Sequence, residues 1–257
     1  MHIHYFQHDH FEDLGYIGDW ATRHNFTTSV TRFDLKQAIP SHENYDWLVV
    51  LGGKMSVNDS EKFPWLTTEI EYIKQAISKG KIVIGICLGS QLVAKACSSD
   101  VFRNTEPEMG FWPVTFTETA KNDSVFRHFR NEMTVLHVHF DTFSLPGGAV
   151  SMASSAVTAC QAFRLGKNIF AFQFHFEVTP LNVAGFIREI EHELVEGKYS
   201  QTAEQMLERT DCCSQNNLVF DKVLDEILAQ TEISNNCSTA NLADKVSLSE
   251  VGRQKLP

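Results

Sequence analysis

The sequence has no apolar run close to the roughly 18 residues that a membrane-spanning helix needs. Its N-terminus has no basic segment followed by an apolar stretch, so we expect no signal peptide. Positive charge is scarce: 22 Lys and Arg stand against 32 Asp and Glu, a net charge of −10. This balance argues against a nucleic-acid-binding protein and against a polybasic protein of membrane surfaces.

A cysteine framework is also missing. The six cysteines form no Cys-x-x-Cys pair and no regular spacing, so we expect reduced thiols and a cytoplasmic location. Several histidines lie near the N-terminus, but no cysteine or paired carboxylate pattern accompanies them. We therefore predict no metal site, because a defined site needs three or four convergent ligands. No motif indicates a cofactor.

The composition that remains is that of a globular protein. The 257 residues are 43% hydrophobic and 21% charged, which is enough for a buried core. Short apolar runs alternate with segments of helical periodicity, as in residues 46–51 and 65–79. This alternation predicts an α/β fold with three layers, in which a mostly parallel central sheet has helices on both faces.

Residues 11–24 have the pattern of a helix. Two later regions depart from simple alternation. In the first, between residues 107 and 174, several strand patterns follow one another. From about Thr231 the chain is rich in Ser, Asn, Thr and charge and has few large apolar residues. We therefore predict a domain over residues 1–230 and a polar, weakly ordered C-terminal tail over 231–257.

The most informative junction is Gly85-Ile-Cys87-Leu-Gly89, where a buried strand runs directly into a helix pattern. A nucleophile on such a sharp turn needs small residues two positions to either side, because larger side chains would clash where the helix folds back. A cysteine placed there lies at a helix N-terminus, which favours its thiolate. The pattern predicts a nucleophile elbow with Cys87 as the nucleophile.

A cysteine nucleophile needs a base, and the base needs a group that orients it. His175 and Glu177 follow a strand and are two residues apart, so both side chains are able to project to the same side. A third feature is Gly52-Gly53 after a buried strand, where free backbone N–H groups are able to stabilise an oxyanion. This turn is not a phosphate-binding Walker A loop, because it lacks the required Gly and Ser/Thr spacing.

Taken together, these motifs resemble the class I glutamine amidotransferases, and most of all the stand-alone proteins similar to the glutaminase domain of GMP synthase. The resemblance spans roughly residues 45–195 in the family's order. It is carried by six stretches: Leu51-Gly-Gly-Lys-Met-Ser-Val-Asn-Asp59, Gly85-Ile-Cys-Leu-Gly-Ser-Gln-Leu-Val-Ala94, Pro107-Glu-Met-Gly-Phe-Trp-Pro-Val114, His139-Phe-Asp-Thr-Phe-Ser-Leu-Pro146, Cys160-Gln-Ala-Phe163 and Phe172-Gln-Phe-His-Phe-Glu-Val-Thr-Pro180.

The resemblance implies a role for each matching residue. Cys87 would attack the side-chain amide carbon of glutamine, His175 would carry the proton to the leaving ammonia, and Glu177 would hold His175. The oxyanion would lie between the N–H groups of Gly53 and Leu88. The residues implied in substrate binding are Gln91, His139, Phe140 and Asp141.

Three positions depart from the family pattern. Phe176 stands where the family usually has proline between the catalytic histidine and glutamate, and proline would fix the backbone there. Lys54 stands where proline is common, beside the oxyanion glycine. Ser90 stands where histidine or tyrosine is common, and we expect it to alter only the rim of the pocket.

The resulting prediction is an enzyme that hydrolyses glutamine to glutamate and ammonia through a cysteine thioester. No synthetase motif is present, so we expect the ammonia acceptor to be a separate protein or absent. One alternative is a γ-glutamyl peptidase or hydrolase, since a γ-glutamyl amide is glutamine with a substituted nitrogen. Another is a catalytically silent binding module of the same fold, against which the presence of Cys87, His175 and Glu177 argues.

Overall fold

A computed structural model describes the backbone of residues 1–251 and the side chains of residues 1–231. Its centre is one nine-stranded sheet with the order β2-β1-β3-β4-β9-β8-β7-β5-β6. The strands are β1 (His2–Gln7), β2 (Thr27–Arg32), β3 (Trp47–Val50), β4 (Ile82–Ile86), β5 (Val101–Phe116), β6 (Glu132–Phe143), β7 (Val150–Ser154), β8 (Ala162–Leu165) and β9 (Ile169–Phe172).

The sheet has two halves. β2, β1, β3, β4 and β9 pair in parallel. β8, β7, β5 and β6 continue the sheet in antiparallel pairs, and the long β5 and β6 form a ribbon at its far edge. The predicted α/β fold with a central sheet is therefore confirmed, and its parallel part is the half that carries β4 and the junction at Cys87.

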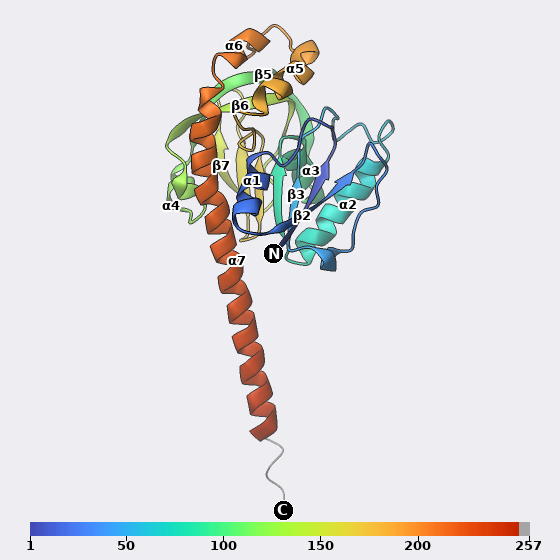
Figure 1. Ribbon diagram of the computed structural model, residues 1–257, viewed down its shortest axis with the longest axis vertical. Coiled ribbons are helices and arrows are strands. Elements are labelled where there is room, and N and C mark those ends of the chain that lie inside the picture. The colour runs from blue at the N-terminus through green and yellow to red at the C-terminus, as the bar shows by residue number, and fades with distance from the viewer. Residues whose placement is uncertain (252–257) are drawn as a thin grey trace, which may run out of the picture.

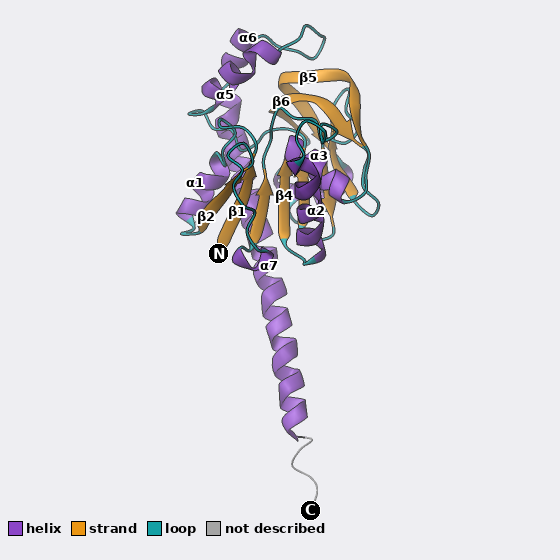
Figure 2. Cartoon of the chain, turned by 90° about the vertical axis from the view of Figure 1, so that its right-hand side faces the viewer, coloured by secondary structure: helices purple, strands orange, loops and turns teal. Residues whose placement is uncertain are grey.

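Helices cover both faces of the sheet (Figures 1 and 2). Buried side chains of α1 and α7 share one apolar cluster with the strands, and those of α2 and α3 share another on the opposite face. This arrangement gives the predicted three layers. The helices are α1 (Tyr16–Arg23), α2 (Trp65–Ser78), α3 (Leu88–Ala96), α4 (Glu118–Asn122), α5 (Val183–Ile190), α6 (Ala203–Leu207) and α7 (Asp211–Val251), with short 3₁₀ segments η1 (His42–Asn44), η2 (Phe126–His128) and η3 (Glu191–Glu193).

The predicted helix over residues 11–24 is wrong at its start. Gly15 has φ +46°, and a Cβ there would lie 2.2 Å from the Glu177 carbonyl oxygen. The N–H of Tyr16 donates to that same oxygen at 2.7 Å, so α1 begins against the backbone of Glu177. Residues 11–14 instead form a loop, and this loop carries Glu12 to the edge of the sheet where Cys87 lies.

Helix α7 is the longest helix of the described backbone, and its C-terminal part extends away from the body of the molecule (Figure 1). Ile227 is the last buried side chain among those described in this helix. The backbone is helical through Val251, while the side chains from 232 onward and all of residues 252–257 lie outside the described part. The boundary at residue 231 and the weakly ordered tail stay predictions. Among the described residues no helix is long and apolar enough to cross a membrane.

Candidate active site

Cys87 lies at the carboxyl end of β4, directly before α3, with φ 52° and ψ −112°. Glycine is required at positions 85 and 89, because other parts of the backbone approach both positions too closely to leave room for a Cβ. A Cβ at Gly85 would lie 2.6 Å from the Gly89 carbonyl oxygen, and one at Gly89 would lie 1.9 Å from the Val50 carbonyl oxygen. The backbone therefore has the geometry of a nucleophile elbow, in which the cysteine has a backbone conformation that residues other than glycine seldom adopt.

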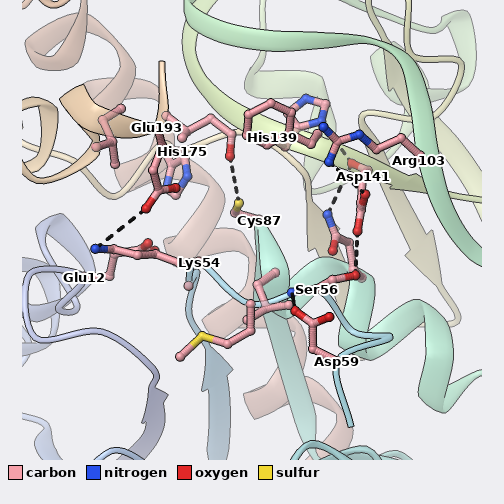
Figure 3. A pocket seen from close by; sticks show the side chains of 17 residues that line it. Glu12, Lys54, Ser56, Asp59, Cys87, Arg103, His139, Asp141, His175 and Glu193 are labelled. Carbon is pink, nitrogen blue, oxygen red and sulfur yellow. Dashed lines mark hydrogen bonds and ion pairs between the residues drawn. The ribbon is translucent and has the colours of Figure 1, made fainter. Parts of the chain in front are cut away.

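His175 and Glu177 lie next to this elbow. The His175 Nδ1–H donates to Glu177 Oε1 at 2.6 Å, and both side chains are buried. The backbone N–H of His175 donates to the Leu136 carbonyl at 2.9 Å, which ties the residue to β6. His175 Nε2 has no hydrogen-bond partner among the described residues, and Cys87 and His175 line one cavity (Figure 3). The arrangement leaves Nε2 free to exchange a proton with Sγ or with a substrate.

Burial dominates the electrostatics of this group. It raises the pKa of the Cys87 thiol, and the neighbouring His175 offsets only part of that rise. The thiolate expected from the helix N-terminus is therefore not favoured by the site as a whole. Burial alone would lower the pKa of His175, but the negative charge of Glu177, joined by that of Cys87 when its thiol ionises, outweighs burial and raises the pKa well above its ordinary value. Transfer of the Cys87 proton to His175 is thus stabilised by Glu177.

The two predicted oxyanion donors lie on either side of the cysteine. Gly53 follows β3, which is the neighbour of β4 in the sheet, and Leu88 is the first residue of α3. Neither N–H donates a hydrogen bond within the described part of the chain. Both residues line the same cavity as Cys87, so the two free N–H groups are available to an oxygen atom bound there.

The cavity has a volume of about 350 Å³. Every predicted site residue lines it except Glu177, which lies behind His175. Gln91 is fixed by two hydrogen bonds from its Nε2, to the Asp141 carbonyl at 3.3 Å and to Gln173 Oε1 at 3.2 Å. The lining residues are Glu12, Gly53, Lys54, Met55, Ser56, Asp59, Cys87, Leu88, Gln91, Arg103, Val138, His139, Phe140, Asp141, His175, Ile190 and Glu193.

Phe176 compensates for the missing proline by packing. Its ring is buried and stacks on Phe129 at 5.1 Å and on Phe220 of α7 at 5.8 Å between centroids. Asn217 of α7 donates to the backbone carbonyls of Phe176 and Val178, at 2.9 and 3.0 Å. Side-chain packing and α7 therefore hold the backbone between the histidine and the glutamate.

The other two departures also have a structural account. The Lys54 N–H donates to Asp9 Oδ2 at 3.0 Å, a hydrogen bond that proline is unable to make, and this anchors the turn after Gly53. Ser90 does not lie on the pocket rim as expected. It is fully buried, and its hydroxyl donates to the Cys87 carbonyl at 2.7 Å, so it supports the elbow from within.

Sequence reasoning missed Glu12, because nothing in the pattern of its loop marks a functional carboxyl. Its Oε2 lies against Gly52 and has no hydrogen-bond partner among the described residues. Burial raises the pKa of Glu12 to about 7, His175 opposes that rise, and Glu177 adds to it. The cavity thus contains a carboxyl group that changes its charge near neutral pH.

The outer part of the cavity is polar and charged (Figure 3). Asp141 accepts a hydrogen bond from Ser56 Oγ at 2.7 Å and lies 3.9 Å from Arg103 Nη1. On the other side, Lys54 Nζ lies 3.7 Å from Glu193 Oε1. These groups offer both signs of charge to the polar parts of a substrate.

One buried trio of the described residues has donor atoms close enough for a metal ion. Glu108, His137 and His139 have one ligand atom each within 4.8 Å of the others. Glu108 Oε2 already accepts hydrogen bonds from Thr158 and Gln161, both at 2.6 Å, and lies 3.3 Å from His139 Nε2. We interpret Glu108 and His139 as a polar support for the strand that carries Phe140 and Asp141, whereas neither ring nitrogen of His137 has a hydrogen-bond partner among the described residues.

Known proteins resemble this chain over most of its length. Residues 20–185 match the model of the family "Glutamine amidotransferase class-I". A glutamine amidotransferase-like protein of Salmonella typhimurium is 34% identical over 202 residues, which cover 77% of this chain and 84% of that protein. One of the subunits of the glutamine-hydrolysing GMP synthase of Saccharolobus solfataricus is 32% identical over 151 residues, which cover 55% of this chain and 76% of its own length.

A further relative is named for a different activity. The γ-glutamyl-L-1-hydroxyisopropylamide hydrolase of a Pseudomonas species is 25% identical over 164 residues, 60% of this chain and 55% of that protein. Among solved structures, a glutamine amidotransferase of Methylobacillus flagellatus has a TM-score of 0.81 at 26% identity and covers 89% of this chain and 94% of its own. The chain therefore belongs to the class I glutamine amidotransferase family.

Proposed function

We propose that the protein hydrolyses the γ-amide bond of glutamine through a thioester on Cys87. The observation that supports this proposal most is one cavity that joins a cysteine on a nucleophile elbow, a histidine with a free Nε2, and two unpaired N–H groups. Each part answers one requirement of acyl transfer, namely a nucleophile, a base and a site for the oxyanion.

In the first half of the reaction, Cys87 Sγ attacks the amide carbon while its proton passes to His175 Nε2. The carbonyl oxygen becomes an oxyanion that accepts hydrogen bonds from the N–H groups of Gly53 and Leu88. Glu177 accepts a hydrogen bond from Nδ1 and stabilises the imidazolium. When the C–N bond breaks, His175 gives the proton to the leaving nitrogen, so ammonia departs and a γ-glutamyl thioester remains.

In the second half, a water molecule attacks the thioester and loses a proton to His175. The C–S bond breaks, Cys87 recovers the proton from His175, and glutamate leaves. Gln91 and the backbone of His139, Phe140 and Asp141 line the cavity where the glutamyl part would bind. The chain needs no cofactor for either half-reaction in this scheme.

We propose that the ammonia goes to a separate acceptor enzyme. The relationship to single subunits of GMP synthases supports a partner protein, since such a name describes one part of a glutamine-hydrolysing synthase. In this proposal the isolated chain turns glutamine over slowly, because such pairs complete or close the site when the partner binds. The proposed place of action is the cytoplasm.

The second candidate is a γ-glutamyl hydrolase that uses the same triad. The similarity to a hydrolase of γ-glutamyl-L-1-hydroxyisopropylamide favours it. A substituted nitrogen needs room on the side of Cys87 away from Asp141, and the cavity continues on that side to Lys54 and Glu193. The third possibility, a silent binding module, fits poorly with a complete catalytic arrangement.

Release of ammonia or amine from glutamine and from a set of γ-glutamyl amides and peptides distinguishes the three. The leading proposal predicts measurable but slow hydrolysis of glutamine, which the Cys87→Ser variant loses. Fast hydrolysis of a γ-glutamyl amide, with glutamine a poor substrate, would make the hydrolase the function. No product from any of these substrates, with Cys87 also inert to a glutamine-like electrophile, would indicate a binding module.

A further inference from the structure

A buried histidine lies directly behind the glycine turn of the proposed oxyanion site. His8 follows β1, and its Nδ1 lies 2.8 Å from the Gly52 carbonyl oxygen. Its Nε2 lies 2.9 Å from Glu69 Oε1 of α2. The ring lies nearly parallel to the rings of Phe33 and Trp65, at 5.6 and 5.5 Å between centroids, and those two rings stack on each other at 4.7 Å. His8 is thus held through both ring nitrogens and by two aromatic neighbours.

Both neighbours of the ring nitrogens are acceptors. A carbonyl oxygen and a carboxylate oxygen have no hydrogen to donate, so each ring nitrogen satisfies its neighbour only by carrying a hydrogen of its own. Burial alone would lower the pKa of His8, but Glu69 and the hydrogen bond to Gly52 outweigh it and raise the pKa. These contacts favour the doubly protonated, positively charged ring.

The hydrogen bond to Gly52 also determines where the next N–H points. The Gly52 carbonyl and the Gly53 N–H belong to one peptide unit, and the described chain contains no cis peptide bond. In a trans peptide the C=O and the N–H point in opposite directions. The carbonyl is held toward His8, away from the cavity, so the Gly53 N–H faces the cavity that Gly53 lines.

We propose that His8, held in place by Glu69, is a positioning residue that orients and polarises the Gly52–Gly53 peptide of the oxyanion site. This inference rests on the proposed function, in which the Gly53 N–H binds the oxyanion. His8 is absent from the cavity lining, so its effect on the reaction would pass through that peptide. Without the hydrogen bond from His8, the Gly52–Gly53 peptide is able to rotate. The Gly53 N–H would then point away from the substrate oxygen as negative charge develops on it.

Two double variants separate this role from simple stability. His8→Leu/Glu69→Met and His8→Asn/Glu69→Met both replace the buried ion pair, so neither leaves a charge without a partner. Only the asparagine amide is able to donate to the Gly52 carbonyl near the original Nδ1 position. We expect the leucine variant to release ammonia from glutamine roughly 10- to 100-fold more slowly than the asparagine variant, because a lost or displaced oxyanion donor costs about that much or more.

The rate at which iodoacetamide alkylates Cys87 serves as the control measurement. This displacement reaction depends on the reactivity of the thiol but forms no oxyanion. We expect the two double variants to be alkylated at equal rates. His4→Gln is the control substitution, because His4 lies on β1, the strand that precedes His8, is buried, and its side chain forms hydrogen bonds with Ser29 and Thr31, away from the cavity. Equal hydrolysis by the two double variants would overturn the inference, whereas no hydrolysis by the wild type would refute the proposed function instead.

A measurement on the wild-type protein covers the case in which neither double variant folds. Nitrogen NMR of the His8 ring reports whether each ring nitrogen carries a hydrogen. We expect both to be protonated at neutral pH. A ring with a bare Nδ1 would contradict the inference, because it could not donate to the Gly52 carbonyl.

Discussion

The Glu12→Gln variant tests the electrostatics of the site through the stability of the fold. Burial raises the pKa of Glu12 from 4.5 to about 7, against the opposing effect of His175 and with a further contribution from Glu177. Because the folded protein binds this proton more tightly than the unfolded chain, it gains stability at low pH and loses that gain as the pH rises from about 4.5 through 7. The pKa shift of Glu12 contributes about 3 kcal/mol to the free energy of unfolding at low pH, and about 2.5 kcal/mol of this is lost between about pH 5 and pH 8.

The assay is the free energy of unfolding by urea at these two pH values, for the wild type and for Glu12→Gln. Glutamine has the same shape and no titrating proton, so the wild type should lose about 2.5 kcal/mol more than the variant on going from pH 5 to pH 8. Glu71→Gln, at an exposed position of α2, serves as the control and should follow the wild type. The reasoning would be refuted if Glu12→Gln and the wild type had parallel pH dependence.

The remaining predictions concern the elbow, the triad and the C-terminus. Gly89→Ala should unfold the protein or displace α3, seen as a large loss of thermal stability, because its Cβ would lie 1.9 Å from a carbonyl oxygen. Phe176→Ala should cost about 3–5 kcal/mol in the free energy of unfolding, because it empties a buried aromatic site; a cost below about 1 kcal/mol would contradict the packing argument. Cys87→Ser and His175→Ala should each abolish hydrolysis with the fold intact by circular dichroism, and their losses should not add. A chain that ends at Gln230 should keep its fold and its hydrolysis rate, and loss of both would show that the predicted tail is a docked segment or part of a partner interface.

The parts of this site that could be predicted from the sequence are those set by local geometry. A strand that meets a helix at Gly85-Ile-Cys87-Leu-Gly89 leaves little choice of backbone, and the structure has the turn that this pattern requires. The spacing of His175 and Glu177 likewise places their side chains within a hydrogen bond of each other. The buried strands β3 and β4 were predictable because parallel strands covered on both faces are apolar throughout.

The parts that could not be predicted depend on residues far apart in the sequence. Glu12 reaches the site because Gly15 fits against the carbonyl of Glu177, a contact between the first and last parts of the domain. The ion pair of His8 and Glu69 joins a strand end to the middle of a helix, and neither residue has a signature of its own. The antiparallel half of the sheet was underestimated because the first part of β5 is polar and exposed, so its pattern is not that of a strand.

Mass spectrometry of the Cys87 peptide after rapid acid quenching detects the proposed covalent intermediate itself. With glutamine or a γ-glutamyl amide turning over, we predict a γ-glutamyl thioester on Cys87, absent from the Cys87→Ser variant. Product formation by the wild type with no adduct on Cys87 at any quench time, and equal product formation by Cys87→Ser, would contradict this prediction.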